Sequence, residues 1–302
     1  MIEVKDLHKS YGKGGKTKAI SGISFNVDDG EIFGVIGPDG AGKSTLFRIL
    51  TSLILPDSGS AIMNGYDVVK DYRKIRQIIG YMPGRFSLYQ DLSVEENLKF
   101  FATLFNTTIE ENYLLIKDIY QQIEPFKKRR AGALSGGMKQ KLALSCALIH
   151  KPEILILDEP TTGVDPVSRK EFWDMLARLK EQGIIILVST AYMDEASRCD
   201  RIALIRNGKF IASDAPQGII EDYSETLWAV EGSRMSTLLK ELRNYNKVKS
   251  SFAFGDKIHI TVDEGLQTGE LIQYLSDKEF KDVNITPIEP TVEDCFMALT
   301  SK

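Results

Sequence analysis

Short aliphatic runs alternate with longer segments of helical periodicity along the first two thirds of the chain. The runs occupy residues 32–36, 78–82, 154–157 and 184–188, and each ends at a glycine-containing, acidic or polar turn. Short runs that are apolar throughout are typical of strands buried on both faces of a sheet. Helix-period segments, such as residues 46–53, lie between them. The pattern predicts an α/β fold with a mostly parallel sheet.

The region from about residue 85 to residue 150 has a different character. Its apolar residues recur with helical spacing at residues 94–104 and 113–123, and it holds few β-branched runs. We interpret this region as a helical insertion into the α/β core. Turn-forming residues at 214–218 then mark a boundary, which divides the chain into predicted domains at residues 1–215 and 216–302.

The second predicted domain follows the order strand, helix, strand, strand, helix, strand, helix. This order and amount of structure is sufficient for a small α+β domain, which would serve as an accessory or dimerisation domain. The predicted elements are residues 226–231, 235–244, 248–254, 257–262, 269–276, 283–288 and 292–300.

The 302 residues are 43% hydrophobic and 26% charged, the balance of a soluble globular protein with about two domains. No aliphatic run approaches the roughly 20 residues of a membrane-spanning helix, and charges interrupt the start of the chain where a secretory signal would be apolar. We expect a cytoplasmic protein with only peripheral membrane contact. The net charge of -4, with neither part strongly basic, predicts no nucleic-acid partner. Cys146, Cys199 and Cys295 are widely spaced, which predicts reduced, buried thiols.

A glycine-rich segment connects the first aliphatic run to the helix-period segment after it. Its pattern, G-x-x-x-x-G-K-[ST], lets backbone N–H groups curl around phosphate oxygens at a helix N-terminus. Lys43 supplies a cation for the β and γ phosphates, and the Ser44 hydroxyl is suited to ligate Mg²⁺. We therefore predict that ATP and Mg²⁺ bind at Gly37, Pro38, Asp39, Gly40, Ala41, Gly42, Lys43, Ser44 and Thr45.

Two adjacent carboxylates, Asp158 and Glu159, end the aliphatic run at residues 154–157. They are expected at the carboxyl end of a strand, where α/β sheets bind ligands. Asp158 is suited to hold Mg²⁺, and Glu159 is suited to orient and deprotonate the water that attacks the γ-phosphate. An acidic turn without a function would have the same local sequence. The phosphate loop upstream favours the catalytic interpretation.

Residues 134–140, LSGGMKQ, begin a helical run that continues through Leu148, so their bare N–H groups form a second anion site. Together with the phosphate loop and the acidic strand end, this signature resembles the nucleotide-binding subunit of an ABC transporter over residues 1–215. The resemblance implies a P-loop NTPase fold, with a RecA-like sheet core and a helical subdomain. It also implies a head-to-tail dimer, in which one subunit contacts the ATP of the other through Ser135, Gly136, Gly137 and Gln140.

The resemblance implies roles for two further residues. Tyr11 stands where the family stacks an aromatic ring on adenine, although a loop tyrosine packed against its own domain would look the same. Asp165 stands in the family's loop across the dimer interface. Asp165 is also suited to cap the helix that is expected to begin at Pro166, and the two roles are compatible.

Two positions depart from the family pattern. Gly84 replaces a glutamine that ligates Mg²⁺, and Ala191 replaces a histidine that hydrogen-bonds the γ-phosphate. Loss of one preorganised donor typically costs about 100- to 1000-fold in rate. We expect a site that binds Mg-ATP and hydrolyses it slowly. A heterodimer with a fully equipped second ATPase subunit is favoured. The alternatives are a homodimer with two slow sites, or one or both substitutions made deliberately to trap ATP.

The end of the chain, residues 288–300, resembles the Pro-x-x-Glu-Asp ending of ATPases from ABC-2 type exporters, including the daunorubicin-resistance group. The resemblance implies a separate ABC-2 type membrane permease and a position on the inner face of the cell membrane. It favours export of drugs, lipids or polysaccharide. A domain that only packs and dimerises the subunits would fit the same tail.

Two other classes of function stay as alternatives. One is a non-transport ABC ATPase, and the other is a regulatory ATP-binding module with little hydrolysis. The basic run at residues 127–130 fits contact with an anionic lipid or a partner subunit, and it also fits a solvated face.

Overall fold

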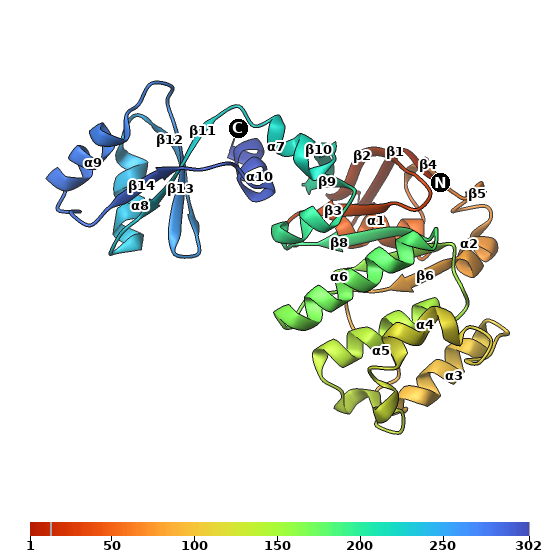
Figure 1. Ribbon diagram of the computed structural model, residues 1–302. Coiled ribbons are helices and arrows are strands. Elements are labelled where there is room, and N and C mark those ends of the chain that lie inside the picture. Colours follow the sequence, from red (N-terminus) through yellow and green to blue (C-terminus); the bar gives the residue numbers. More distant parts are fainter. Residues whose placement is uncertain (13, 302) are drawn as a thin grey trace. The chain divides into compact units, whose positions relative to one another are not determined.

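The computed structural model describes residues 1–12 and 14–301, with the side chain of Ser301 excepted. The chain divides into two units, Met1–Pro216 and Gln217–Lys302. Each unit has its own sheets and helices, which are coloured along the sequence in Figure 1. The first unit carries the phosphate loop, the acidic strand end and the signature.

A six-stranded sheet of order β10-β9-β3-β8-β7-β6 forms the centre of the first unit. Its strands are parallel apart from the edge strand β10. Every residue of β3, β7 and β8 is buried, which explains their unbroken aliphatic runs. The four predicted strands are present, and two extend beyond their predicted ends, to Asp158 and Thr190. The bounds are β3 Ile32–Ile36, β6 Ile79–Met82, β7 Ile154–Asp158, β8 Ile185–Thr190, β9 Arg201–Arg206 and β10 Lys209–Asp214.

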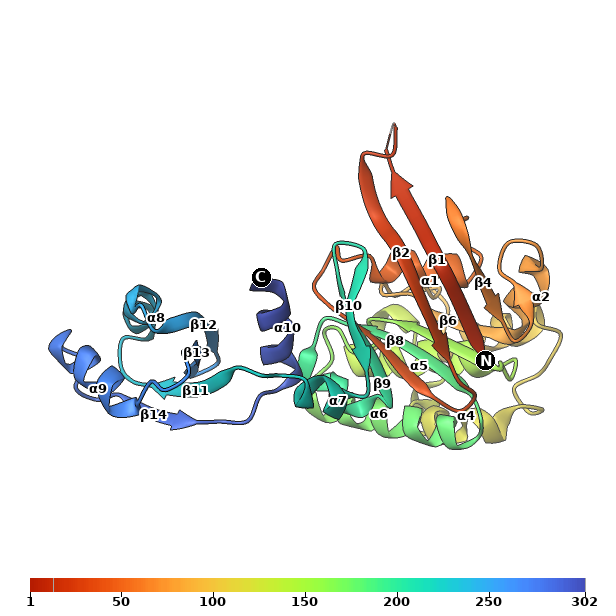
Figure 2. The ribbon, with the colours of Figure 1, turned by 90° about the horizontal axis from the view of Figure 1, so that it is seen from above.

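A second, antiparallel sheet of order β2-β1-β4-β5 belongs to the same unit (Figure 2). This sheet was not predicted, because a register shift between Val4 and Leu7 breaks the alternation of β1, and Asp6 there has a φ of 45°. Helix α1 (Lys43–Leu50) contributes Leu46 and Phe47 to one core shared by both sheets. The bounds are β1 Ile2–Tyr11, β2 Thr17–Val27, β4 Ser58–Met63 and β5 Tyr66–Asp67.

Helices fill the connection between β6 and β7, as predicted. The predicted helix at Val94–Leu104 is present and begins with a capping box, in which Ser93 and Glu96 satisfy each other's backbone N–H groups. The second helix ends at Tyr120, three residues earlier than predicted, where a 3-10 turn follows. The elements are α2 Tyr72–Ile78, α3 Val94–Leu104, α4 Tyr113–Tyr120, η1 Glu124–Phe126, η2 Ala131–Ala133, α5 Gly136–Leu148, α6 Pro166–Glu181 and η3 Met193–Arg198.

The second unit begins within α7 (Pro216–Glu221) and contains an antiparallel sheet of order β12-β13-β11-β14. The chain order β-α-β-β-α-β with this strand order is the split-βαβ arrangement. Helices α8 and α9 share a core with the sheet, and His259 Nδ1 in β13 lies 2.7 Å from Asp294 Oδ1 in α10. All seven predicted elements are present, as β11 Thr226–Glu231, α8 Met235–Asn244, β12 Val248–Phe254, β13 Lys257–Val262, α9 Thr268–Asp277, β14 Asn284–Pro287 and α10 Val292–Ser301.

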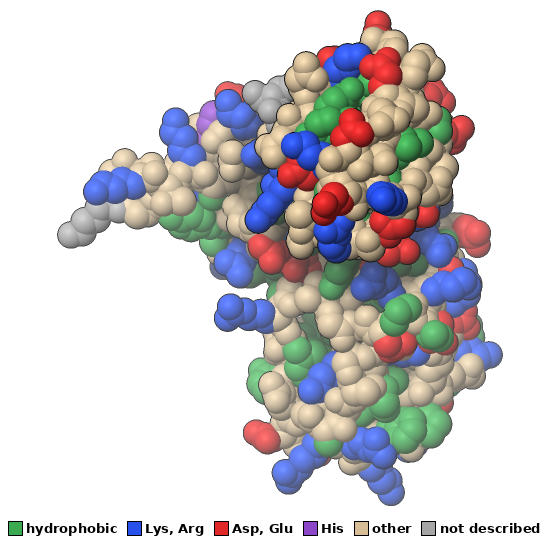
Figure 3. Space-filling view, turned by 90° about the vertical axis from the view of Figure 1, so that its left-hand side faces the viewer, with side chains coloured by type: hydrophobic (Ala, Val, Ile, Leu, Met, Phe, Trp, Pro, Cys, Tyr) green, Lys and Arg blue, Asp and Glu red, His purple; other side chains and the backbone are tan. Residues whose placement is uncertain are grey.

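Three general predictions can be compared with the described residues. Cys146, Cys199 and Cys295 are free and buried, as predicted, and burial raises the pKa of each thiol. Within residues 1–12 and 14–301, no helix combines the length and the apolar character that crossing a bilayer requires. Acidic and basic side chains are interspersed over much of the surface in view in Figure 3.

Candidate functional site

The phosphate loop is held in place by three neighbouring strands. The Gly37 N–H donates to the Thr190 carbonyl of β8 at 3.2 Å. A Cβ on Gly37 would lie 2.3 Å from the Ile205 carbonyl oxygen of β9. Gly42 has a φ of 115°, and a Cβ there would lie 2.4 Å from the Ala19 carbonyl oxygen of β2. Close backbone contacts therefore require glycine at both positions, and at Gly42 the left-handed backbone requires it as well.

Lys43 is the first residue of α1, and its side chain is only 3% exposed. Its Nζ donates to the carbonyl oxygens of Gly37 at 2.7 Å and Pro38 at 3.1 Å. The same Nζ lies 3.1 Å from Glu159 Oε1, whereas the exposed carboxylate of Asp39 lies 4.0 Å away. The structure thus brings the predicted phosphate-binding cation and the predicted catalytic carboxylate into direct contact.

Asp158 is the last residue of β7 and is buried. Ser189 is a buried residue of β8, and its Oγ donates a hydrogen bond of 2.6 Å to Asp158 Oδ1. The next residue, Glu159, donates its N–H to both the carbonyl oxygen and the Oγ of Ser189, each at 3.0 Å. Glu159 also has a φ of 50°, in the left-handed region that disfavours side chains. The strand therefore ends in a sharp turn that Ser189 holds in place.

These residues fit Mg²⁺ and a triphosphate. Mg²⁺ takes oxygen ligands and is commonly held by one or two side chains, with phosphates and water completing its shell. A buried carboxylate at Asp158 and the hydroxyl of Ser44, beside loop N–H groups, are donors of this kind. A Cβ on Gly84 would lie 3.6 Å from Asp158 Oδ2, so the loop after β6 also reaches this carboxylate. In the described part of the chain, no group of three or more His, Cys, Asp or Glu side chains is placed to hold a metal by itself.

The two substituted positions lie against the retained ones. A Cβ on Gly84 would lie 3.2 Å from the carbonyl oxygen of Asp158. Ala191 directly follows Thr190, whose carbonyl accepts the Gly37 N–H. A side chain at position 84 would thus begin beside Asp158, the predicted metal ligand, and position 191 directly follows a residue that contacts the phosphate loop.

Tyr11 is the last residue of β1, and 40% of it is exposed. It pairs with Thr17 of β2, and two residues further along β2 the Ala19 carbonyl contacts Gly42. The end of this hairpin therefore lies near the phosphate loop with an exposed ring. This placement is compatible with the predicted stacking on adenine.

The signature lies against a different part of the chain. Ser135 caps α5 by accepting from Met138 N, and Gly136 and Gly137 form the first turn, with Gln140 one turn further. A Cβ on Gly136 would lie 3.1 Å from the Gly163 carbonyl oxygen, and a Cβ on Gly137 would lie 2.9 Å from Ser168 Oγ. Among the described residues, no hydrogen bond or ion pair joins the signature to the phosphate loop.

Asp165 belongs to the segment that the signature contacts. Its carboxylate accepts from Ser168 N at 3.0 Å, so the predicted N-cap of α6 is confirmed. Hydrogen bonds from the backbone and the hydroxyl of Ser168 lower the pKa of Asp165. The structure thus places Ser135, Gly136, Gly137 and Asp165 together, and separately from Lys43 and its partners.

An apolar groove of about 770 Å³ opens beside the loop at residues 83–88. Helices α3 and α5 form its other walls, and Leu53 and Leu104 at its rim are 53% and 60% exposed. His150 lines the groove, stacks on Phe105 with ring centroids 3.8 Å apart, and has a pKa lowered by burial. Gly84 in this loop was singled out from the sequence, but the helical walls were not, because they come from segments distant along the chain.

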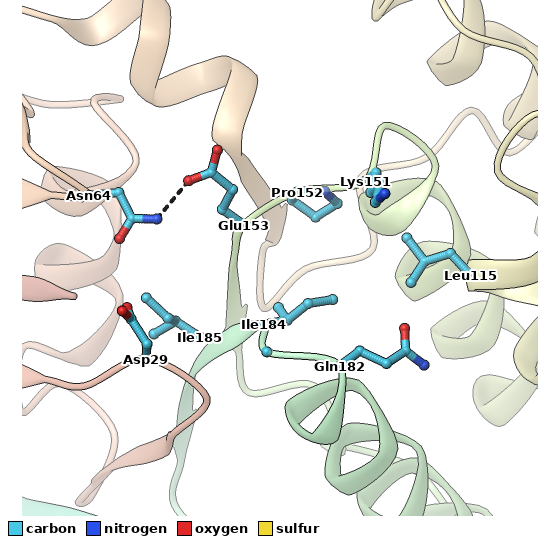
Figure 4. Close-up of a pocket in the computed structure, with 10 residues that line it drawn as sticks. Asp29, Asn64, Leu115, Lys151, Pro152, Glu153, Gln182, Ile184 and Ile185 are labelled. Carbon is cyan, nitrogen blue, oxygen red and sulfur yellow. Dashed lines mark hydrogen bonds between the residues drawn. The ribbon is translucent and has the colours of Figure 1, made fainter.

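A second hollow, of about 470 Å³, lies at the opposite ends of the strands (Figure 4). Its lining includes residues just before β7, such as Glu153, and residues at the start of β8, such as Ile185. Asn64 Nδ2 donates to Glu153 Oε2 at 2.7 Å, as the dashed line shows. Because β7 and β8 are parallel, this hollow is at their amino ends and is separate from the predicted nucleotide site.

Sequence reasoning missed a buried polar cluster that connects the segments after β7 and β8. Glu195 is buried and accepts from Thr161 Oγ1 at 2.7 Å. The Arg169 guanidinium lies 3.6 Å from Glu195 Oε1 and 4.2 Å from the centroid of the Tyr192 ring. No single motif contains these residues, and nothing in the sequence indicates that their side chains lie together.

Comparison with known proteins decides the family. A sequence profile described as "ABC transporter" matches residues 20–162. Over 305 aligned residues the chain is 35% identical to the probable multidrug ABC transporter ATP-binding protein YbhF of Escherichia coli (strain K12), with 99% of this chain and 52% of that protein covered. It is 32% identical to the doxorubicin resistance ATP-binding protein DrrA of Mycobacterium tuberculosis (strain ATCC 25618 / H37Rv), with 99% and 93% covered. The chain belongs to the ABC transporter family.

The chain spans about half the length of YbhF and nearly all of DrrA. Among solved structures, a dimeric ATP-binding cassette in a post-hydrolysis state, bound to ADP and Pi, matches with a TM-score of 0.65 and 25% identity. That match covers 71% of this chain and 98% of the cassette. The predicted P-loop NTPase fold and the resemblance to ABC transporter ATP-binding proteins are both confirmed.

Proposed function

We propose that the chain is the ATP-binding subunit of an ABC-2 type exporter and couples ATP binding and hydrolysis to transport through a separate membrane permease. The observation that carries the proposal is the contact of Lys43 with Glu159, beside Asp158, on a phosphate loop at the carboxyl edge of the sheet. The names of YbhF, a probable multidrug ABC transporter ATP-binding protein, and DrrA, a doxorubicin resistance ATP-binding protein, support drugs as the substrate class to test first. The subunit would then work in the cytoplasm, against the inner face of the cell membrane.

Each residue at this edge has a distinct role in the proposed reaction. Lys43 and the loop N–H groups bind the β and γ phosphates, and Ser44 and Asp158 hold Mg²⁺. When bound, Mg²⁺ neutralises charge that develops on the phosphate oxygens. Glu159 orients the attacking water and accepts its proton. Tyr11 stacks on the adenine ring.

The proposed dimer is head to tail. Ser135, Gly136, Gly137 and Gln140 of one subunit face the γ-phosphate held by the other, with Asp165 contacting the partner across the interface. Support comes from the compact group that the signature forms with the segment at residues 163–168, separate from Lys43. The dimeric state of the solved cassette supports the same arrangement. ATP would favour the closed dimer, and hydrolysis would favour reopening.

The chain's own site is proposed to be the slow one of a heterodimer. Gly84 supplies no metal ligand and Ala191 supplies no donor to the γ-phosphate, while the signature is intact. A partner with both side chains would hydrolyse ATP against this chain's signature. A homodimer with two slow sites is the competing arrangement.

The apolar groove is the proposed contact for the permease. It combines exposed leucines with the loop at residues 83–88, and this loop reaches the carboxylate of Asp158 through Gly84. A permease segment seated in the groove would therefore act on a loop that touches the metal ligand. This connection gives a physical route from dimer closure to the membrane subunit.

A regulatory or non-transport ATP-binding role is the second candidate. The observation that favours it is the loss of two side chains from one nucleotide site at Gly84 and Ala191. In that case ATP would bind and be hydrolysed poorly with every partner.

Steady-state ATPase activity distinguishes these proposals. The purified chain is assayed alone and with a candidate second ATPase subunit, with Glu159→Gln in this chain and the equivalent change in the partner. The heterodimer predicts activity that needs the partner, depends on the partner's glutamate and largely survives Glu159→Gln. Ordinary activity of the chain alone, abolished by Glu159→Gln, would instead indicate a working homodimer. Absence of activity in all mixtures would favour the regulatory role.

A further inference from the structure

One buried hydroxyl contacts both acidic residues of the nucleotide site. Ser189 lies in β8, in register with Asp158 of the neighbouring strand β7, and has no exposed surface. Its Oγ is 2.6 Å from Asp158 Oδ1 and 3.0 Å from Glu159 N. A serine hydroxyl has one hydrogen to donate and lone pairs to accept. Because Glu159 N can only donate, the hydroxyl hydrogen goes to Asp158.

This arrangement fixes the orientation of the Asp158 carboxylate. Oδ1 is engaged by Ser189, whereas Oδ2 is the oxygen near Gly84, 3.6 Å from the position that a Cβ would take there. In the family pattern a glutamine would approach from the loop after β6, but Gly84 leaves that side without a side chain. Ser189 thus binds the carboxylate from β8, the strand on the other side of β7 from β6.

The same hydroxyl supports the backbone of Glu159. The Glu159 N–H is shared between the carbonyl oxygen and the Oγ of Ser189. Glu159 has a φ of 50°, a conformation that surrounding contacts must hold. With this backbone, Glu159 Oε1 lies 3.1 Å from Lys43 Nζ.

We infer that Ser189 is a positioning residue, which presents Asp158 to Mg²⁺ and holds the turn at Glu159. The inference rests on the proposed function, because it takes Mg-ATP as the ligand. It goes beyond the sequence motifs, which assign no role to this serine.

The test separates metal-dependent from metal-independent nucleotide binding. ATP affinity of the full-length chain is measured by calorimetry with excess Mg²⁺ and with a chelator, and the ratio of the two affinities is the readout. A hydrogen bond to a charged group contributes roughly tenfold or more in affinity. For Ser189→Ala we expect the Mg²⁺-dependent ratio to fall by about tenfold, with the affinity in chelator unchanged. A change that merely disturbed the fold would alter both affinities.

Two comparisons make the result specific. Ser145→Ala is a matched control, because Ser145 is also buried but donates only to the Lys141 carbonyl at 2.8 Å. Its ratio should equal that of the unmodified chain. In an Asp158→Asn background, adding Ser189→Ala should change the ratio little further, because the residue through which Ser189 acts has been altered.

The outcomes are distinguishable. An unchanged ratio in Ser189→Ala, with the unmodified chain binding Mg-ATP normally, would overturn the inference and leave the proposed function intact. A parallel fall in both affinities would also overturn it, in favour of a purely structural role. If the unmodified chain binds ATP under neither condition, the proposed function fails instead.

Discussion

The residues at or after the ends of strands β3 and β7 carry the predicted phosphate-binding and catalytic side chains, whereas Gly84 and Ala191, in the loops after β6 and β8, carry no such group. All of these residues stand at or after the carboxyl ends of strands, at one edge of the sheet. Lys43, Asp158 and Glu159 are linked by direct contacts or by shared contact with Ser189. Gly84 lies beside Asp158 and Ala191 directly follows Thr190, which contacts the phosphate loop, and neither residue offers a side-chain donor or ligand. The groups predicted to bind the phosphates and to activate water are retained, whereas the two side chains that the family pattern places beside Mg²⁺ and the γ-phosphate are absent. We therefore expect ATP binding and ATP hydrolysis to be separable in this cassette.

Lys43→Ala should give the largest effect on this comparison. Lys43 is the buried cation of the loop, and its loss removes several charge-assisted hydrogen bonds to phosphate. We expect ATP affinity to fall by about 100-fold or more, measured by calorimetry. Lys170→Ala is the matched control, because Lys170 is exposed and pairs with Asp174 on the surface of α6. Retained affinity in Lys43→Ala would remove the basis for the proposed phosphate site.

Ala191→His should sharpen the comparison from the other side. The residue before it, Thr190, accepts the Gly37 N–H of the phosphate loop, and the family pattern has at position 191 a histidine that hydrogen-bonds the γ-phosphate. We expect the chain's own turnover to rise by about tenfold or more, since a preorganised donor acts on developing charge. Ala191→Leu adds bulk without a donor and should leave turnover low. If both variants behave alike, the slow site has another cause.

Gly84→Gln should have a smaller effect. A side chain at position 84 begins 3.6 Å from Asp158 Oδ2, where an amide oxygen can join the metal shell. We expect Mg²⁺-dependent ATP affinity to rise by about threefold to fivefold, measured as a Mg²⁺ titration. Gly84→Ala supplies only the Cβ and should show no such rise. An equal rise in Gly84→Ala would point to loop stiffening instead of ligation.

The smallest effect concerns the groove and depends on pH. Burial lowers the pKa of His150, so the unfolded chain takes up its proton more readily than the folded one. Above the ordinary pKa of 6.5, the His150 ring is neutral in both the folded and the unfolded chain, so it adds no pH dependence to the free energy of unfolding. As the pH drops below 6.5 towards the lowered folded pKa, the unfolded chain takes up the proton first and stability falls. His150→Gln should make the urea midpoint depend less on pH between about pH 7 and about pH 5.5. The change should correspond to less than one proton taken up on unfolding. An unchanged slope would assign the acid sensitivity to other groups.

Much of the first unit could be predicted, because its central strands are buried on both faces. The unbroken aliphatic runs at β3, β7 and β8 admit few other interpretations. The antiparallel sheet was missed for the opposite reason, since bulges and the left-handed Asp6 interrupt its alternation. The second unit was predictable element by element, but its strand order depends on pairings between distant segments.

The site shows the same division. The sequence motifs identified Lys43, Asp158 and Glu159 as site residues, because each stands at a fixed spacing from the end of a predicted strand. Ser189 and the cluster of Thr161, Arg169 and Glu195 could not be assigned, because their partners come from other strands and helices. Contacts of this kind depend on the register between strands, which could not be predicted from the sequence.

The left-handed backbone of Glu159 has a consequence for how this sequence can drift. A non-glycine residue in that conformation is disfavoured by roughly 1–2 kcal/mol, so glycine would make the fold more stable at this position. Natural proteins are only marginally stable, so a replacement that relieves strain can offset destabilising substitutions elsewhere. A carboxylate at such a position therefore comes at a cost in stability that glycine would avoid. In a lineage whose site had lost its use, position 159 would be among the first places where a stabilising replacement could settle.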